Sequence, residues 1–126
     1  MGEDIPSFCY PFCQRPDPLR KAVIAAGYKQ ARADTNTAYY PLQTPIDHFD
    51  VGCRLATENE QVAEWMRRDC WHILMFHGIG TLNDGWGPIT VAAFTRQMEE
   101  LAKHRDSGAV QVVTFKDGAD RFQEPK

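Results

Sequence analysis

Histidine and aspartate side chains are the groups in this chain best suited to acid–base chemistry. His77 ends the apolar run Cys70-Trp71-His72-Ile73-Leu74-Met75-Phe76-His77 and is followed by a glycine-rich loop. Active groups of parallel α/β folds collect at the C-terminal ends of strands, so His77 is a candidate general acid or base. On position alone, a histidine that only forms hydrogen bonds in a loop is the favoured interpretation.

Two aspartates flank His48-Phe49 and offer carboxylates to the same chemistry. If Asp47 and Asp50 lie on a strand, they point to opposite faces, so only one can reach a site shared with other strands. A carboxylate beside His77 would orient the imidazole and fix its tautomer. A solvated carboxylate at a strand end is an equally good interpretation.

The histidines and cysteines do not form a recognisable metal motif. The four histidines stand at 48, 72, 77 and 104, without a His-x-x-x-His or His-Glu-x-x-His spacing. The cysteines stand at 9, 13, 53 and 70, and only the first two are close in sequence. We therefore predict no metal ligands and reduced thiols in or near strands.

The glycine-rich loop and its aromatic residue suggest a binding role. Gly78-Ile79-Gly80 lacks the residues of a phosphate-binding loop and is better explained by a turn. Trp86, together with Tyr39 and Tyr40, could stack on sugar rings. A buried contact under a lid is at least as good an explanation.

The elements that would position these residues alternate between strand and helix. We predict strands at 7–12, 28–32, 46–55, 70–77 and 110–115, helices at 17–26, 57–68 and 91–105, a loop at 33–45, and one helical turn at 118–122. Asp17-Pro18 and Thr90 open two of the helices, and Gly27 ends the first. This order predicts a single α/β domain over residues 1–126 with a mostly parallel sheet flanked by helices.

Composition excludes several classes of function. The chain has 126 residues and a formal net charge of −3, which gives no basic surplus for nucleic-acid binding. No apolar run is long enough to span a bilayer, and no signal peptide is visible. We expect no nucleic-acid or membrane partner and, by default, a cytoplasmic location.

Three runs, Phe8-Cys9-Tyr10-Pro11-Phe12-Cys13, Asp47-His48-Phe49-Asp50-Val51 and Ile73-Leu74-Met75-Phe76-His77, occur in the order of known motifs. With Pro18–Val23, Ala26-Gly27-Tyr28 and the final 108–122 stretch, they resemble the C-terminal half of a polysaccharide deacetylase (carbohydrate esterase family 4, the NodB-homology domain). The resemblance covers nearly the whole chain. It implies a partial (β/α) barrel and an origin in enzymes that deacetylate amino-sugar polymers.

The resemblance also implies a role for each matching residue. The Phe12 backbone N–H would donate to an oxyanion, Asp50 would orient the acid histidine, and His77 would protonate the leaving amine. Leu74 or Met75 would line the pocket for the acetyl methyl group. Cys9 stands where the family often has an arginine, Cys13 where it has glycine, and Val51 where it has tryptophan. Together with Trp86 and Tyr10 as substrate contacts, these residues make up the predicted site.

The family's base and metal ligands have no counterpart in these residues. Family members use zinc or another divalent metal, held by motifs that precede Phe8 in the family's order, and only seven residues precede Phe8 here. We therefore expect a fragment or a free-standing descendant that is inactive alone and needs no cofactor of its own. The alternatives are a non-enzymatic module that binds a saccharide or small ligand, and an interaction protein acting through a homo-oligomer interface.

Overall fold

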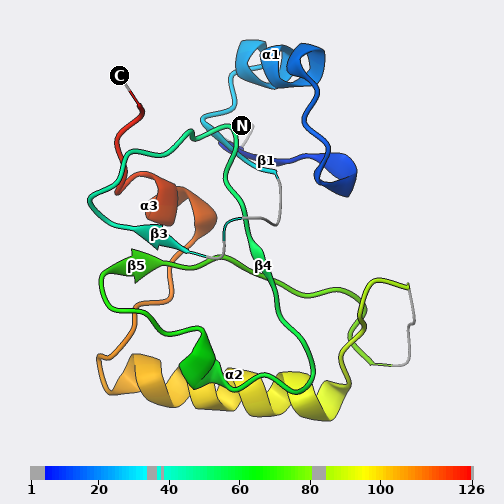
Figure 1. Ribbon diagram of the computed structural model, residues 1–126, viewed down its shortest axis with the longest axis vertical. Coiled ribbons are helices and arrows are strands. Elements are labelled where there is room, and N and C mark those ends of the chain that lie inside the picture. Colours follow the sequence, from blue (N-terminus) through cyan, green and yellow to red (C-terminus); the bar gives the residue numbers. More distant parts are fainter. Residues whose placement is uncertain (1–4, 34–36, 38, 81–84, 126) are drawn as a thin grey trace. The chain divides into compact units, whose positions relative to one another are not determined.

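The computed structural model describes residues 5–33, 37, 39–80 and 85–125 (Figure 1). They form two compact units. The first comprises Met1–Arg54, Asp69–Ile73 and Val113–Lys126, and the second comprises Leu55–Arg68 and Leu74–Val112. The prediction of one domain over 1–126 is left as a prediction. Parts of the predicted loops, at 34–36, 38 and 81–84, lie outside the described residues.

The first unit begins with a strand–helix–strand arrangement (Figure 1). Strands β1 (Ser7–Cys9) and β2 (Gln30–Arg32) pair in parallel, and helix α1 (Asp17–Ala25) connects them. Val51 extends the arrangement through a parallel bridge to Arg32. This short parallel ladder brings together two of the motif-like runs, 8–13 and 47–51, on neighbouring segments.

Helix α1 begins and ends close to the predicted positions. Pro16 occupies the N-cap and Asp17 lies in the first turn without a capping hydrogen bond, so Asp17 is not the cap that the sequence predicted. Gly27 follows the helix with a φ of 92°, a left-handed conformation that favours glycine at this position. Val23 turns inward and joins a buried cluster. The other buried residues of this cluster are Tyr10, Ala31 and Ala33.

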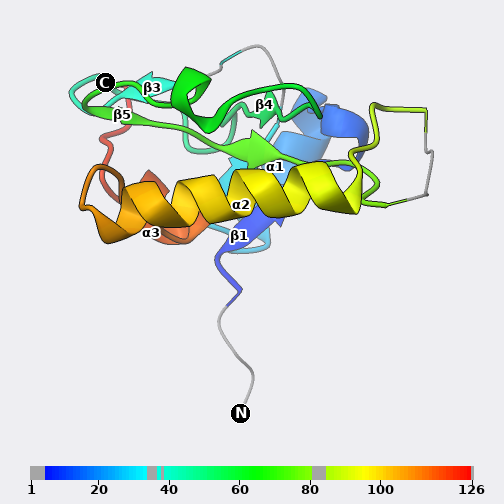
Figure 2. The same ribbon diagram turned by 90° about the horizontal axis from the view of Figure 1, so that it is seen from below.

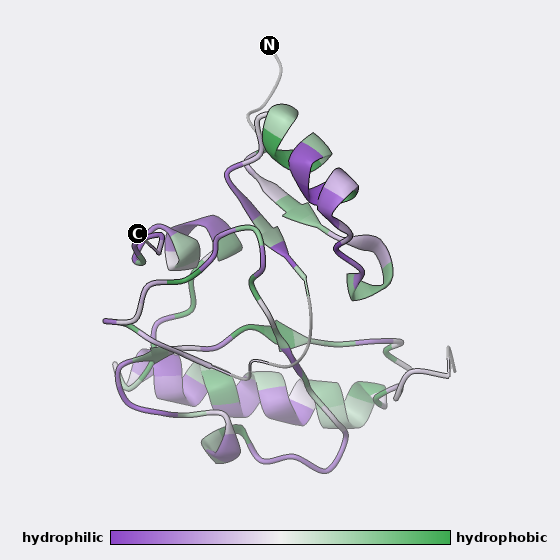
Figure 3. Cartoon of the chain, turned by 45° about the horizontal axis from the view of Figure 1, so that its top comes forward, coloured by the Kyte–Doolittle hydropathy of each residue, from purple (hydrophilic) through white to green (hydrophobic). Residues whose placement is uncertain are grey.

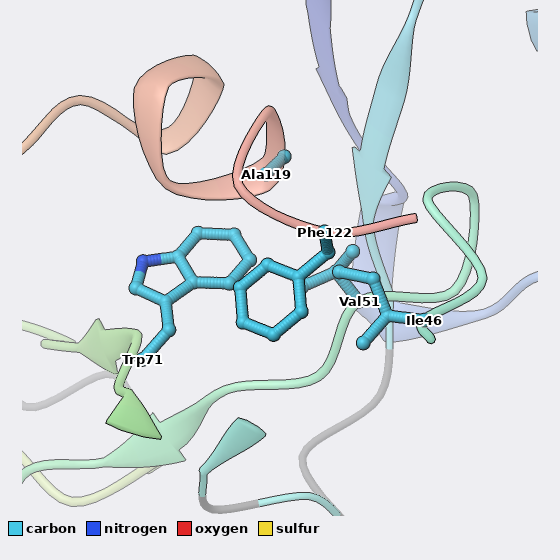
Figure 4. Close-up of a cluster of buried hydrophobic side chains, with 5 residues drawn as sticks. All are labelled: Ile46, Val51, Trp71, Ala119 and Phe122. Atoms are coloured by element: carbon cyan, nitrogen blue, oxygen red, sulfur yellow. The ribbon is translucent and has the colours of Figure 1, made fainter. Parts of the chain in front are cut away.

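A second cluster of the first unit is built around Trp71 (Figure 4). The antiparallel strands β3 (Tyr40–Pro41) and β5 (Cys70–Trp71) place the indole next to helix α3 (Phe115–Ala119). The Phe122 ring packs on it, with ring centroids 5.6 Å apart. Gly118 comes so close to the indole that a β-carbon there would collide with it.

The second unit is organised on its long helix, α2 (Val91–Asp106) (Figure 2). Thr90 caps the helix by accepting a hydrogen bond from the Ala93 N–H at 3.2 Å. Hydrophilic and hydrophobic residues alternate along this helix (Figure 3). Beside it, the 3-10 helix η2 (Val62–Glu64) carries a buried cluster formed by Ala56, Val62 and Trp65.

Two very short strands lie where the chain passes from one unit to the other. They are β4 (Arg54–Leu55) and β6 (Leu74–Met75). In the first unit, the Arg54 N–H donates to the Ile73 carbonyl at 2.8 Å. In the second unit, the Ala56 N–H donates to the Met75 carbonyl at 2.9 Å. Both segments therefore have extended backbone, but only over a few residues.

The predicted partial (β/α) barrel with a mostly parallel sheet is wrong. The described residues form only two-stranded sheets, with strands of two or three residues, and no barrel. A hydrophobic pattern favours extended backbone, but it does not determine which strands pair with one another, and a barrel needs each strand to pair with two others. The architecture is small and mixed α/β.

Three predicted elements fail for local reasons. The 46–55 strand is broken because the Asp47 carboxylate accepts a hydrogen bond from the Phe49 N–H at 2.9 Å, which closes a turn. The 110–115 strand is absent, and Thr114 instead caps α3. The 57–68 helix is reduced to η2, although Glu60 does accept from the Thr57 N–H, as a capping box would.

The predicted 70–77 strand is divided into β5 and β6 by His72 and Ile73. Most of this segment is half-buried rather than enclosed on both faces. No helix in the described part of the chain is long and apolar enough to cross a membrane.

Candidate functional site

The turn after β1 carries the predicted oxyanion donor. The 3-10 helix η1 (Pro11–Cys13) is closed by the Cys13 N–H, which donates to the Tyr10 carbonyl at 3.1 Å. Phe12 and Cys13 have φ values of 54° and 57°, which non-glycine residues rarely adopt. The Phe12 side chain is 88% exposed. The Phe12 amide is not one of the donors that close this turn, which suits the role predicted for it.

Tyr10 lies below this turn in the core of the first unit. Its side chain is 1% exposed, and its ring meets Phe8 edge-on with centroids 5.4 Å apart. Its hydroxyl is buried without a hydrogen-bond partner among the described residues. Burial raises the pKa of Tyr10, and the nearby Arg20 and Arg15 guanidinium groups oppose that increase. The structure therefore buries both the ring and the hydroxyl of Tyr10, the residue predicted as a substrate contact.

The two predicted aspartates are held by arginines. The Arg15 guanidinium lies 2.7 Å from an Asp50 carboxylate oxygen. The Arg20 guanidinium donates to both oxygens of Asp47 at 2.8 Å. Both pairs are partly exposed, so each contributes little stability. Asp50 already has a cationic partner in Arg15. A histidine that approached Asp50 would therefore have to share this carboxylate with Arg15.

In the second unit, backbone hydrogen bonds fasten the two ends of the loop after His77. The Gly80 N–H donates to the Ile89 carbonyl at 2.8 Å, and the Ile89 N–H donates to the Gly78 carbonyl at 2.9 Å. This pairing returns the chain toward the end of the 70–77 run. Trp86 thereby stacks on His77, with ring centroids 6.2 Å apart and an interplanar angle of 24°.

Trp86 combines this fixed position with exposure. Its side chain is 65% exposed. Leu74, predicted to line an acetyl pocket, packs half-buried against the cluster formed by Ala56, Val62 and Trp65. Met75 is also half-buried. The His77–Trp86 pair is therefore the part of the predicted site in this unit that presents an aromatic surface to solvent.

The predicted site residues fall into both units. Tyr10, Phe12 and Asp50 belong to the first, whereas Leu74, Met75, His77 and Trp86 belong to the second. The approach of Asp50 to His77 stays a prediction. Among the described residues, no group of three or more histidine, cysteine or acidic side chains is arranged to hold a metal ion.

Sequence reasoning missed a cluster of three cysteines around Arg32. The Arg32 Nη2 lies 2.7 Å from the Cys9 sulfur, and Nη1 lies 3.3 Å from Cys13 and 3.1 Å from Cys53. Burial raises the pKa of Cys53, and Arg32 opposes the increase. The register that sets Cys9 beside Arg32 is the signal that would have revealed the cluster. That register becomes visible only when the two strands are paired in parallel.

Comparisons with protein-family models, curated proteins and solved structures give no match for this chain.

Proposed function

We propose that this chain is a polysaccharide deacetylase-like protein that binds acetylated amino-sugar chains and does not hydrolyse them on its own. The observation that supports the proposal most is the exposed Trp86 ring, stacked on His77. The motif resemblance supplies the class of ligand, and the aromatic pair supplies a surface to bind it. The proposal does not depend on a barrel.

The chemistry of the pair suits a sugar ring. The faces of a pyranose carry C–H groups that pack on the negative face of an indole, while its hydroxyl and acetamido groups need hydrogen-bond partners. Trp86 supplies an exposed indole, and His77 supplies ring nitrogens beside it. The Gly80–Ile89 pairing fixes the backbone at Gly78, Gly80 and Ile89, so less conformational entropy is lost at these positions on binding.

The same residues supply little for hydrolysis. Amide hydrolysis in the resembled family depends on a metal that polarises the carbonyl group and activates water, and general acid catalysis alone contributes only about 10²–10⁴-fold. The four histidines of the sequence have no spacing that provides a metal pair from one helix or strand. Asp50 is engaged by Arg15. We therefore propose binding in place of turnover.

Titration calorimetry with N-acetylated chito-oligosaccharides tests the binding. We expect saturable heat with the wild-type chain and an affinity at least about tenfold lower with Trp86→Ala, as for loss of a central aromatic contact. Trp86→Phe should retain part of the affinity. Val112→Ala is the matched control, because Val112 is an apolar side chain of the same unit that is 60% exposed. Equal binding by wild type and Trp86→Ala would refute the proposed site.

Acetate release from the same oligosaccharides, with zinc or cobalt added, tests the absence of turnover. We expect the wild-type chain and His77→Ala to release acetate equally slowly, at the rate of the buffer. Metal-dependent release that disappears in His77→Ala would show that the chain is an enzyme.

A further inference from the structure

The Cys9, Cys13 and Cys53 sulfurs surround one guanidinium in the first unit, a feature that the proposed function does not use. All three are within hydrogen-bond range of Arg32 nitrogens, at 2.7, 3.3 and 3.1 Å respectively. Cys13 and Cys53 share the same nitrogen, so their sulfurs are near neighbours. Cys9 contacts the other terminal nitrogen of the same planar group. Arg32 therefore brings together three thiols from separate segments of the chain.

The three thiols differ in access to solvent. Cys9 is exposed, Cys13 is intermediate and Cys53 is buried. Burial raises the pKa of Cys53, which keeps it in the thiol form and makes it a poor nucleophile. A dissolved electrophile can therefore reach Cys9 first, with Cys13 as the next most accessible sulfur of the cluster.

The guanidinium suits nucleophilic chemistry at Cys9. The thiolate is the reactive form of cysteine, and a cation at hydrogen-bond distance compensates the charge that it carries. An arginine also stays protonated at every physiological pH, so this compensation is permanent. The hydrogen bonds to the thiols raise the pKa of Arg32 further, against the opposing effect of its burial.

We propose that Cys9 is a hydroperoxide-reactive cysteine and that Cys13 resolves it to a disulfide. The Cys9 thiolate attacks one peroxide oxygen and the O–O bond breaks, so the sulfur becomes a sulfenic acid and the leaving oxygen takes a proton to form water or an alcohol. The Cys13 thiolate then attacks the Cys9 sulfur, the S–O bond breaks and water leaves. Two thiols are oxidised by two electrons, and one hydroperoxide is reduced.

The turn between the two residues supports this pairing. Cys9 ends β1 and Cys13 ends η1, and the hydrogen bond from the Cys13 N–H to the Tyr10 carbonyl folds the chain back between them. Their side chains converge on the same guanidinium despite four residues of separation. Only the short β1–η1 segment has to adjust for the sulfurs to meet, whereas movement of Cys53 would disturb a buried position.

Cys70 provides an internal control. It lies in β5, has intermediate exposure, and none of its described contacts is with an arginine guanidinium. The full chain is treated with a small excess of hydrogen peroxide, the remaining thiols are alkylated, and each cysteine is quantified by peptide mass spectrometry. We expect Cys9 to be lost at least about tenfold faster than Cys70, with a Cys9–Cys13 disulfide as the product.

Three variants separate the roles of the cluster. Cys13→Ser should leave a Cys9 sulfenic acid that a dimedone-type carbon nucleophile captures. Arg32→Met should slow the loss of Cys9 toward the rate of Cys70, and Arg32→Lys should retain part of the difference. Equal rates for Cys9 and Cys70 in the wild-type chain would overturn the proposal, and this comparison needs no folded variant. A disulfide that excludes Cys9 would overturn it as well.

Discussion

The hydroxyl of Tyr10 is buried beside two arginines and two aspartates, and yet no described residue accepts or donates a hydrogen bond to it. A buried hydroxyl without a partner costs free energy, because it loses its water and gains nothing in return. The sequence placed Tyr10 among the substrate contacts from its motif, whereas the structure buries its ring. Tyr10 directly follows the three-residue strand β1, and so short a strand gives no periodicity that could tell an inward ring from an outward one.

We predict that Tyr10→Phe changes little or stabilises the fold. Removal of the unpartnered hydroxyl should raise the free energy of unfolding by up to about 1 kcal/mol while the ring packing is kept. Denaturant titration of both proteins at neutral pH measures the difference. A loss of more than about 1 kcal/mol would mean that the hydroxyl makes a stabilising hydrogen bond in solution.

The same residue predicts how stability depends on alkaline pH. Burial raises the pKa of Tyr10 above 10.0, so the folded chain holds this proton more tightly than the unfolded chain does. The resulting stabilisation is complete below the ordinary pKa and is lost as pH rises through the raised pKa. Unfolding midpoints are measured over about three pH units, from pH 8 to 11. They should fall more steeply with rising pH for wild type than for Tyr10→Phe. Identical slopes would contradict this prediction.

At the level of elements, the sequence predicted helices α1 and α2 well, but not the 46–55 and 110–115 strands or the full 57–68 helix. The helix at 91–105 was predicted within one residue, with its Thr90 cap, because a sixteen-residue periodic segment carries its own evidence. The strand at 46–55 failed because Asp47 closes a turn within it. The division of the 70–77 run into β5 and β6 leaves no trace in hydropathy, since both halves remain apolar.

Helix α2 is tied to the segment before η2 by Gln97. This side chain is completely buried, and its amide nitrogen donates to the Thr57 and Glu60 carbonyls at 2.8 and 3.2 Å. We predict that Gln97→Leu lowers the free energy of unfolding by about 1–3 kcal/mol, because two carbonyls lose their donor. Thr95→Leu, at an exposed position of the same helix, should change it by less than about 0.5 kcal/mol. Equal effects of the two substitutions would show that the hydrogen bonds carry no stability.

Helix α3 depends on the absence of a side chain at Gly118. Alanine is ordinarily about 1 kcal/mol better than glycine inside a helix. Here its β-carbon would overlap the Trp71 indole, which Phe115 and Phe122 hold in place. We predict that Gly118→Ala lowers the free energy of unfolding by about 1–3 kcal/mol, as overpacking does. The smaller ring of a Trp71→Phe background should reduce this penalty, and a stabilising Gly118→Ala in the wild-type background would contradict the packing.

At the scale of the whole molecule, the alternating order of predicted elements suggested a parallel barrel, and the structure instead has two-stranded sheets and separate small cores. Alternation predicts which segments are extended, but strand partners depend on long-range contacts that no local pattern encodes. The parallel β1–β2 pair, extended by the parallel bridge between Arg32 and Val51, is a part of the expected topology that formed. His77 was named from its position and its motif, and Trp86 as an aromatic residue of the glycine-rich loop, whereas the distribution of the predicted site over two units could not be predicted.

Self-association is a prediction at this scale, because short paired strands leave open edges and large apolar side chains are exposed. We expect light scattering after size exclusion to show a dimer or larger species at tens of micromolar. Phe12, in the 3-10 helix η1, is the most exposed of the large apolar side chains in the described residues, at 88%. Phe12→Ser should weaken the association. A monomeric wild-type chain would refute this prediction.

The most direct test of saccharide binding uses the three tryptophans of the chain as separate reporters. Trp65 is buried, and its indole N–H donates to Glu60 at 3.0 Å; Trp71 is enclosed by its own cluster; Trp86 is exposed on His77. Two-dimensional NMR of the ¹⁵N-labelled chain resolves their indole N–H signals during titration with an N-acetylated chito-oligosaccharide. We expect a saturable shift of the Trp86 signal, while the Trp65 and Trp71 signals stay in place. A Trp86 signal that does not move at saturating oligosaccharide would contradict it.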